Sequence, residues 1–280
     1  MDARALLKQW GLRPSKGLGQ NFVVNQVVIE RIVAAAELTP DDIVLEIGAG
    51  LGALTGQIAR AAGRVIAVEL DERLLPVLRS VLSGCDNVTL IQGDILALDP
   101  AALIGDAGAG YKIVANLPYY ITSAVLRHLL EASLKPRWMI LTVQREVAER
   151  IVAKPGQMSL LAVSVQFYGQ PRLLFRIKPG SFYPSPGVES AVVRVELYPA
   201  PPVDVESTEA FFRVVRAGFS QRRKQLRNTL AAGLRQQPGE VATRLEKVGV
   251  DPRRRAQTLS LQEWARVTHA LGGRSDEKGG

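Results

Sequence analysis

Residues 43–52 read Ile-Val-Leu-Glu-Ile-Gly-Ala-Gly-Leu-Gly, an apolar run that ends in three alternating glycines. The next stretch, 53–62 (ALTGQIARAA), has the apolar spacing of a helix. A strand that turns through glycines into a helix is typical of ligand-binding α/β folds, because small residues let a ligand press against the backbone. The spacing is G-x-G-x-G and not the G-x-G-x-x-G of dinucleotide enzymes, so by itself the loop fits a ligand-binding turn or an ordinary tight turn.

Short apolar runs alternate with helical patterns on both sides of this loop. A helix is expected from Asn25, a suitable N-cap, to Leu38. Continuous apolar strands separated by helices predict an α/β fold whose parallel sheet is covered on both faces. The expected strands are 43–48, 64–70, 87–94, 111–120 and 138–143, and the extended patterns at 172–178 and 190–198 are expected to join the same sheet.

The proline-rich run 198–207 (YPAPPVDVES) breaks this periodicity and marks a domain boundary. Beyond it the apolar spacing is helical. We therefore expect a catalytic domain over residues 1–200, a small basic helical domain over 201–272 and a disordered tail over 273–280.

Charge is unevenly distributed along the chain. Residues 1–202 carry 20 Lys and Arg against 18 Asp and Glu, whereas residues 203–280 carry 15 against 9. A pI near 9.8 that arises mostly from one segment favours a polyanionic partner, although a solvated helical surface explains any single charge equally well.

The composition excludes several kinds of site and location. Cys85 is the single cysteine and there are two histidines, so an internal disulfide is impossible and no metal or Ser-His-Asp site is expected. No apolar run approaches the ~20 residues of a membrane helix, and the amino terminus has no secretory apolar segment. We expect a cytoplasmic monomer that uses neither membrane nor metal.

Acidic residues end the second and third expected strands. Glu69 is placed where a carboxylate can accept hydrogen bonds from both ribose hydroxyls, and Asp94 where it can accept one from an adenine amino group. Each alone could be a surface carboxylate. With Gly48 and Gly50 at the preceding strand end, they indicate an adenosine pocket.

The fourth strand ends in Val-Ala-Asn-Leu-Pro-Tyr-Tyr (114–120). The Asn116 side chain and the Leu117 carbonyl can accept both N–H bonds of an exocyclic amine, which leaves the nitrogen lone pair free to attack an electrophile. Tyr119 can stack on the base that carries the amine. The alternative is an ordinary strand-to-helix turn in which tyrosine packs.

These segments, in this order, resemble the S-adenosylmethionine-dependent amino-methyltransferases. Residues 11–265 are similar to the small-subunit ribosomal RNA adenine-N6,N6-dimethyltransferases, the KsgA family. The segments that carry the resemblance are GLGQNFVVNQVVIERIV, EIGAGLGALT, NLPYY, QREVAERIVAKPGQ, FYPSPGVESAVVRV and RAGFSQRRKQLRNTL.

The resemblance implies a Rossmann-like methyltransferase sheet and roles for individual residues. The cofactor would be lined by Asn21, Val23, Gly48, Gly50, Glu69, Asp94 and Asn116, with Asn21 and Val23 at its methionine end. Phe182 would clamp the target base opposite Tyr119.

The implied substrate is a pair of adjacent adenosines in the 3′-terminal hairpin loop of small-subunit (16S) rRNA within an immature 30S particle, each methylated twice at N6 during ribosome biogenesis. Arg222, Arg223, Lys224 and Arg227, with part of the 253–255 arginine run, would contact phosphates.

Three alternatives remain open. An erythromycin-resistance methyltransferase shares the fold and motifs but modifies large-subunit rRNA, and a non-catalytic RNA-binding assembly factor could use the same scaffold. A nicotinamide oxidoreductase is disfavoured by the glycine spacing.

Overall fold

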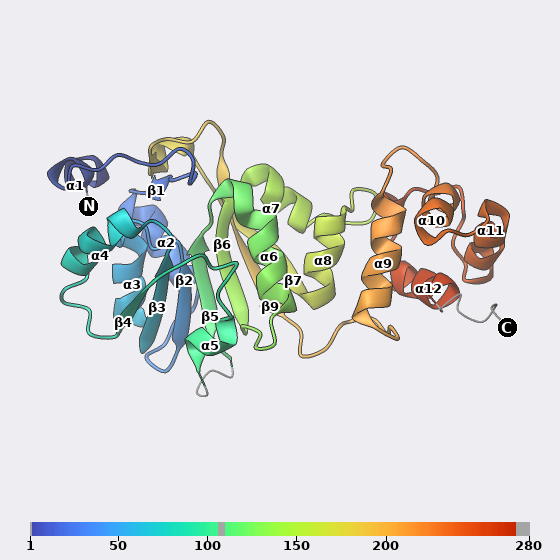
Figure 1. Cartoon of the computed structure of the whole chain (residues 1–280), viewed down its shortest axis with the longest axis horizontal. Coiled ribbons are helices and arrows are strands. Elements are labelled where there is room, and N and C mark those ends of the chain that lie inside the picture. Colours follow the sequence, from blue (N-terminus) through green and yellow to red (C-terminus); the bar gives the residue numbers. More distant parts are fainter. Residues whose placement is uncertain (1, 106–109, 273–280) are drawn as a thin grey trace. The chain divides into compact units, whose positions relative to one another are not determined.

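The computed structural model describes residues 2–105 and 110–272 (Figure 1). These residues divide into two compact units. The sheet unit comprises the described residues of the ranges Met1–Glu149 and Gln170–Leu197, and the helical unit comprises those of Arg150–Gly169 and Tyr198–Gly280. The expected tail, 273–280, lies outside the described residues. Segment 150–169, which the sequence placed in the catalytic domain, belongs by its contacts to the helical unit.

The sheet unit is built on seven strands in the order β4-β3-β2-β5-β6-β9-β7. The neighbours from β4 to β6 are parallel, and β9 is antiparallel to β6. The predicted α/β class is therefore confirmed, including the two late strands. The strands are β2 (Ile43–Ile47), β3 (Arg64–Glu69), β4 (Val88–Gln92), β5 (Lys112–Asn116), β6 (Trp138–Gln144), β7 (Gly169–Ile177) and β9 (Ser190–Leu197).

Helices cover both faces of this sheet. The connection from β2 to β3 and the connection from β5 to β6 run in opposite directions across the sheet, so right-handed crossovers place their helices on opposite faces. The helices and 3₁₀ turns of this unit are α1 (Ala3–Gln9), α2 (Gln26–Ala35), α3 (Ala53–Ala61), η1 (Glu72–Leu74), α4 (Leu75–Val81), α5 (Pro100–Ile104), η2 (Tyr119–Ile121), α6 (Thr122–Glu131), α7 (Arg145–Ile151) and η3 (Pro179–Ser181).

The expected helix N-cap at Asn25 is confirmed, since its side chain accepts a hydrogen bond from the Val28 amide at 3.2 Å. The segment before the main sheet also meets the connection between β7 and β9 in a pairing that the sequence did not indicate. Strand β1 (Phe22–Val23) pairs antiparallel with β8 (Phe182–Tyr183). Two-residue strands have no periodicity to detect, and these two lie far apart in the chain.

The helical unit has a core of its own. It contains α8 (Leu160–Tyr168), α9 (Thr208–Phe219), α10 (Leu226–Leu234), α11 (Pro238–Lys247), η4 (Ala256–Thr258) and α12 (Leu261–Leu271). Phe167 stacks on Phe211 with ring centroids 4.6 Å apart. A Cβ atom at Gly218 would lie 2.4 Å from the Trp264 ring, so α9 and α12 approach closely because this residue is glycine.

One polar residue interrupts the apolar face of β2. Neighbouring residues in register share a face, so Glu46 lies on the same face as Val114 and Ala67, the face on which α2 and α3 pack. Glu46 is 1% exposed, and no described residue forms a hydrogen bond with its carboxylate oxygens. Burial raises the pKa of Glu46 to about 8; an interaction with the Thr55 side chain opposes this rise, and the nearby charge of Glu69 adds to it.

This burial predicts how the stability of the sheet unit depends on pH. The folded state keeps Glu46 protonated while the unfolded chain ionises it above about pH 4.5, so unfolding releases a proton between these pKa values. We expect the free energy of unfolding to fall from pH 5 to pH 7 by up to about 1.4 kcal/mol per pH unit relative to Glu46→Gln.

Urea denaturation of both proteins at pH 5, 6 and 7 measures this difference. Glu146→Gln, which changes an exposed carboxyl of the same unit, is the matched control. Parallel pH profiles for the native protein and Glu46→Gln would contradict the prediction.

Candidate active site

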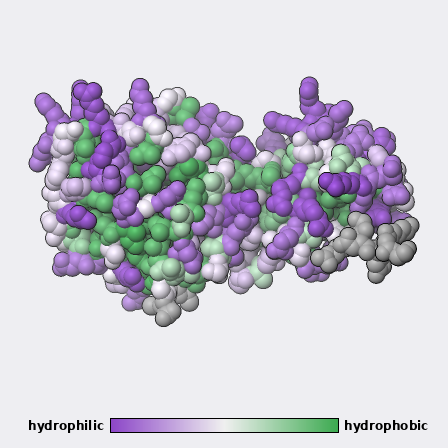
Figure 2. Space-filling model, in the orientation of Figure 1, coloured by the Kyte–Doolittle hydropathy of each residue, from purple (hydrophilic) through white to green (hydrophobic). Residues whose placement is uncertain are grey.

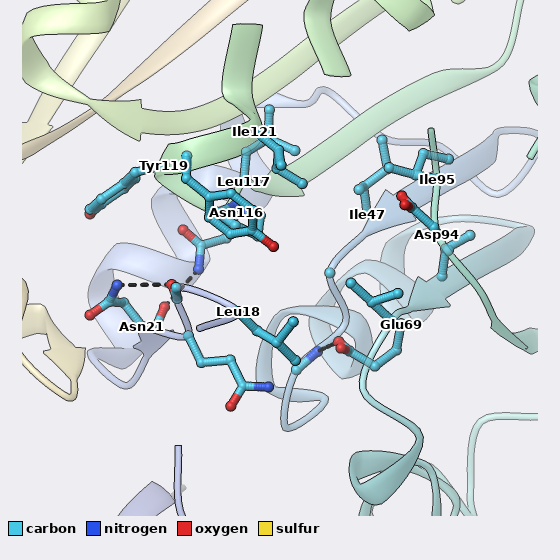
Figure 3. A pocket seen from close by; sticks show the side chains of 18 of the residues that line it. Leu18, Asn21, Ile47, Glu69, Asp94, Ile95, Asn116, Leu117, Tyr119 and Ile121 are labelled. Carbon is cyan, nitrogen blue, oxygen red and sulfur yellow. Dashed lines mark hydrogen bonds between the residues drawn. The ribbon is translucent and has the colours of Figure 1, made fainter. Parts of the chain in front are cut away.

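The carboxyl ends of β2, β3 and β5 and the loop after β4 surround one cavity, and residues 18–22 form another of its walls. It lies where the chain order in the sheet changes direction, between β2 and β5, the place where α/β sheets bind ligands. Its lining includes Leu18, Asn21, Gly48, Gly50, Glu69, Asp94, Ile95, Asn116, Leu117, Tyr119 and Tyr120. Figure 3 shows Glu69 and Asp94 on one side of this space, with Asn21, Asn116 and Tyr119 on the other.

The glycine loop after β2 requires its glycines. Gly48, Gly50 and Gly52 all have positive φ, at 79°, 58° and 80°. Side chains rarely adopt this backbone region. A Cβ atom at Gly50 would also lie 2.9 Å from the Phe22 ring. The G-x-G-x-G spacing thus produces a loop whose backbone is bare toward the cavity.

Glu69 joins this loop to the end of β3. Its Oε2 atom accepts a hydrogen bond from the Gly50 amide at 2.8 Å, and its Oε1 atom accepts one from the Asp71 amide at 2.9 Å. Glu69 is 6% exposed, and burial raises its pKa while the backbone bonds oppose the rise. The two amides fix the orientation of a carboxylate that lines the cavity.

Asp94 stands at the loop after β4. Its Oδ1 atom accepts a hydrogen bond from the Leu96 amide at 2.9 Å, which fixes the side chain at the cavity wall. The two predicted carboxylates therefore line the same space, as three consecutive strand ends suggested.

Asn116 is oriented by the segment that precedes β1. Its Nδ2 atom donates to the carbonyl oxygen of Asn21 at 2.9 Å, and the Asn21 side chain donates to the Gly19 carbonyl at 3.0 Å. Because the amide nitrogen is used in this way, the Oδ1 atom of Asn116 is left facing away from Asn21, on the side of Tyr119 (Figure 3). The site thus offers an acceptor beside an aromatic ring.

Contacts with β6 and β9 hold the residues that follow Asn116. The Leu117 amide donates to the Thr142 carbonyl at 3.1 Å, and Leu117 is 1% exposed. The Tyr119 hydroxyl lies 2.6 Å from the Ser190 Oγ atom. Burial raises the pKa of Tyr119, so the phenol remains protonated at neutral pH.

Two residues expected at the site do not line this cavity. Val23 and Phe182 face each other across the β1–β8 pair and are 7% and 4% exposed within the core. Val23 lines a second cavity, which shares Gly48, Gly50 and Asn116 with the first. Phe182 lines neither of these two cavities, because its ring packs into the core. The clamp formed by Phe182 stays a prediction.

The sequence did not single out Gln20, Phe22 and Tyr120 as parts of the site. The Gln20 Nε2 atom donates to Asp71 Oδ2 at 2.8 Å, which ties the wall segment to the loop after β3. Phe22 packs on the glycine loop. In the sequence, Gln20 and Phe22 belong to the segment GLGQNF, and Tyr120 is the second tyrosine of NLPYY. Neither pattern distinguishes a residue in a cavity wall from one in ordinary packing.

The basic residues lie in the helical unit. Arg222, Arg223 and Lys224 are exposed in the turn between α9 and α10, and Arg227 is half-buried in the first turn of α10. The 253–255 arginine run is partly used in ion pairs. Arg253 pairs with Asp251 at 3.2 Å, and Arg254 pairs with Glu263.

The described part of the chain contains no group of three His, Cys, Asp or Glu side chains that could hold a metal ion. Within the same residues, no helix has the length and apolar character to cross a membrane.

Comparison with known proteins identifies the class of protein that has this site. A family model described as ribosomal RNA adenine dimethylase matches residues 12–271. The chain is 48% identical over 266 residues to the ribosomal RNA small subunit methyltransferase A of Dehalococcoides mccartyi (strain CBDB1), covering 95% of this chain and 91% of that protein. The protein of the same name from Pelotomaculum thermopropionicum (strain DSM 13744 / JCM 10971 / SI) is 47% identical, with 96% and 95% covered.

Solved structures are similar over most of the chain. The 23S rRNA methyltransferase ErmE superposes with a TM-score of 0.72 at 29% identity, covering 90% of this chain and 100% of ErmE. A dimethyladenosine transferase from Plasmodium falciparum shares the fold, with a TM-score of 0.74 at 23% identity, covering 88% of this chain and 95% of that one. The extent of the family match and the identity to curated relatives show that this chain belongs to the ribosomal RNA adenine dimethylase family.

Proposed function

We propose that the protein dimethylates N6 of two adjacent adenosines in the 3′-terminal hairpin loop of small-subunit rRNA, acting in the cytoplasm on an immature small-subunit particle. The orientation of Asn116 carries this proposal. Its amide nitrogen is held by the Asn21 carbonyl, so its oxygen is the atom presented beside Tyr119. An acceptor beside an aromatic ring fits an exocyclic amine on a stacked base.

The cavity fits S-adenosylmethionine by the chemistry of its walls. Glu69 would accept hydrogen bonds from the ribose hydroxyls through lone pairs that the Gly50 and Asp71 amides leave free, and Asp94 would accept one from the adenine amino group. Gly48 and Gly50 let the ligand approach the backbone. Asn21 and Val23 are proposed at the methionine end, Val23 from the adjoining cavity.

Bound S-adenosylmethionine supplies an electrophilic methyl group, so the chain itself needs to position a nucleophile. The Asn116 Oδ1 atom and the Leu117 carbonyl would each accept one N–H bond of the adenine N6 amine. In the first transfer both bonds would draw the nitrogen lone pair out of conjugation with the purine. The new N–C bond would replace the S–C bond of the methyl donor, which leaves as the thioether S-adenosylhomocysteine, and the surplus N6 proton would pass to water. The monomethylated amine keeps one N–H bond for the second transfer. No strong base is required for this step.

Tyr119 would stack on the adenine once the base has left the RNA stack. Phe182 could join it from the opposite side after β8 separates from β1, since its ring is packed in the core of the described structure.

The RNA backbone is proposed to contact Arg222, Arg223, Lys224 and Arg227. These residues are exposed or half-buried, and among residues 2–105 and 110–272 none forms an ion pair with them. Phosphate recognition requires such available cations. The similarity to ErmE favours large-subunit rRNA as the second candidate substrate, but the identity to the small-subunit relatives is higher.

Labelled S-adenosylmethionine tests the choice of substrate. The protein would be incubated with immature small-subunit particles and, separately, with protein-stripped large-subunit RNA. We expect label in small-subunit RNA, at N6 of two neighbouring adenosines by mass spectrometry of the 3′ fragment. Label confined to large-subunit RNA would instead support the ErmE-like activity.

Asn116→Ala is expected to abolish methyl transfer, because it removes an acceptor for the amine. Cofactor affinity should weaken but remain measurable, because Glu69 and Asp94 are unchanged. Initial rates and calorimetry with S-adenosylhomocysteine measure the two effects. Asn87→Ala is the matched control, since the Asn87 amide also donates to backbone carbonyls, at 2.8 Å to both Ala59 and Ala62, but lies outside the cavity. Undiminished turnover in Asn116→Ala would refute its proposed role.

Replacing Arg222, Arg223 and Arg227 together by alanine is expected to weaken RNA binding and to reduce the slope of log K against log salt by about 2, because roughly 0.7 of a counterion is released per phosphate contact with single strands. Filter binding at several salt concentrations measures the slope. Arg244→Ala combined with Lys247→Ala, on α11 of the same unit, serves as the charge control. If the triple variant keeps the original slope, these arginines form only a solvated surface.

A further inference from the structure

The two tyrosines after Pro118 are held in different ways. Tyr120 is 59% exposed, and its ring lies against Gly19, where a Cβ atom would come within 3.1 Å of it. Tyr119 is half-buried, and its hydroxyl lies 2.6 Å from the Ser190 Oγ atom, a short distance for two hydroxyl groups. Tyr119, whose ring would stack on the base, is thus held through its hydroxyl group, at the end of the ring farthest from the backbone.

Ser190 is a rigid point of attachment. It is fully buried at 0% exposure, begins β9 and lies opposite Gln144 in the ladder with β6. The residue before it is also fixed, since the Glu189 carbonyl accepts from the Arg145 amide at 2.9 Å. The Glu189 carboxylate accepts from Arg145 Nη1 at 2.8 Å. The Ser190 hydroxyl therefore has little freedom to move.

Tyr119 lies in a short element. It begins η2, a three-residue turn after Pro118, and its ring is placed by two side-chain torsions, χ1 and χ2. A hydrogen bond at the para hydroxyl restrains the ring at the end opposite the backbone. Because burial raises the pKa of Tyr119, this hydroxyl keeps its proton and can donate to Ser190.

We propose that Ser190 is a positioning residue, which fixes the plane of the Tyr119 ring by holding its hydroxyl and so prepares the face on which the target adenine stacks. This inference rests on the proposed function. Ser190 acts through Tyr119 and does not line the cavity. Its loss should therefore affect the RNA and not the cofactor.

Ser190→Ala, Tyr119→Phe and the double variant test this coupling. Tyr119→Phe removes the same bond while leaving Ser190 in the core, so the test survives if the buried Ser190→Ala fails to fold. A typical hydrogen bond predicts a loss in kcat/KM for RNA of between about twofold and tenfold in each single variant. The double variant should be no worse than the more impaired single variant. The affinity for S-adenosylhomocysteine, measured by calorimetry, should stay unchanged.

A spectroscopic signal reports on stacking directly. 2-Aminopurine at the target position should brighten when it leaves the RNA stack and be quenched again where it stacks on Tyr119, so the bound RNA should be dimmer with the native protein than with Ser190→Ala or Tyr119→Phe. Thr268→Val, which removes a buried hydroxyl that donates to the Trp264 carbonyl at 2.9 Å in the helical unit, should behave as the native protein.

The outcomes separate the two proposals. If the native protein methylates no RNA, the proposed function fails and the role of Ser190 fails with it. If Tyr119→Ala retains full activity and quenching, the stacking role of Tyr119 and the positioning role of Ser190 fail, while methyl transfer to RNA stands. If Tyr119→Ala is impaired while Ser190→Ala and Tyr119→Phe match the native protein, the positioning role alone is overturned. An additional loss in the double variant would also overturn it, because Ser190 would then act independently of the Tyr119 hydroxyl.

Discussion

The hydrogen bond from the Asn116 side chain to the Asn21 carbonyl joins residues 95 positions apart in the chain. It decides which end of the amide meets the cavity, and it also holds the wall segment 18–22 beside the strand ends. An amide turned the other way would present N–H groups, which an exocyclic amine cannot use as acceptors. The acceptor that the cavity presents beside Tyr119 thus depends on this contact, which also helps to hold the wall segment, together with the bond from Gln20 to Asp71.

The face of the sheet on which α2 and α3 pack contains two buried carboxyl groups. Glu46 and Glu69 are 1% and 6% exposed, and two backbone amides bind the second but no described partner binds the first. Buried carboxylates cost stability, and folded proteins retain them mostly where a ligand is bound. Apolar packing by α2 and α3 on this face offsets that cost. Figure 2 shows hydrophobic residues on the visible surface of the sheet unit.

Membership of the ribosomal RNA adenine dimethylase family confirms several predictions made from motifs alone. These are the enzyme class, the methyltransferase fold and S-adenosylmethionine as the cofactor. The family match includes the basic helical segment as well as the sheet unit, so the substrate of this chain is RNA. The roles of individual residues stay proposals, since they depend on geometry with a bound base.

The chain alone predicted the strands of the seven-stranded sheet, the glycine loop and the order of the polar strand ends, because periodicity and turn chemistry are local properties. It therefore predicted that Gly48, Glu69, Asp94 and Asn116 would meet at one edge of the sheet. Tertiary structure alone decided the β1–β8 pairing, which buries Phe182, and the contact of Tyr119 with Ser190. It also assigned residues 150–169 to the helical unit. These features depend on contacts between segments that are distant in the chain. A two-residue strand or a single hydroxyl group has no periodic pattern from which such a contact can be predicted.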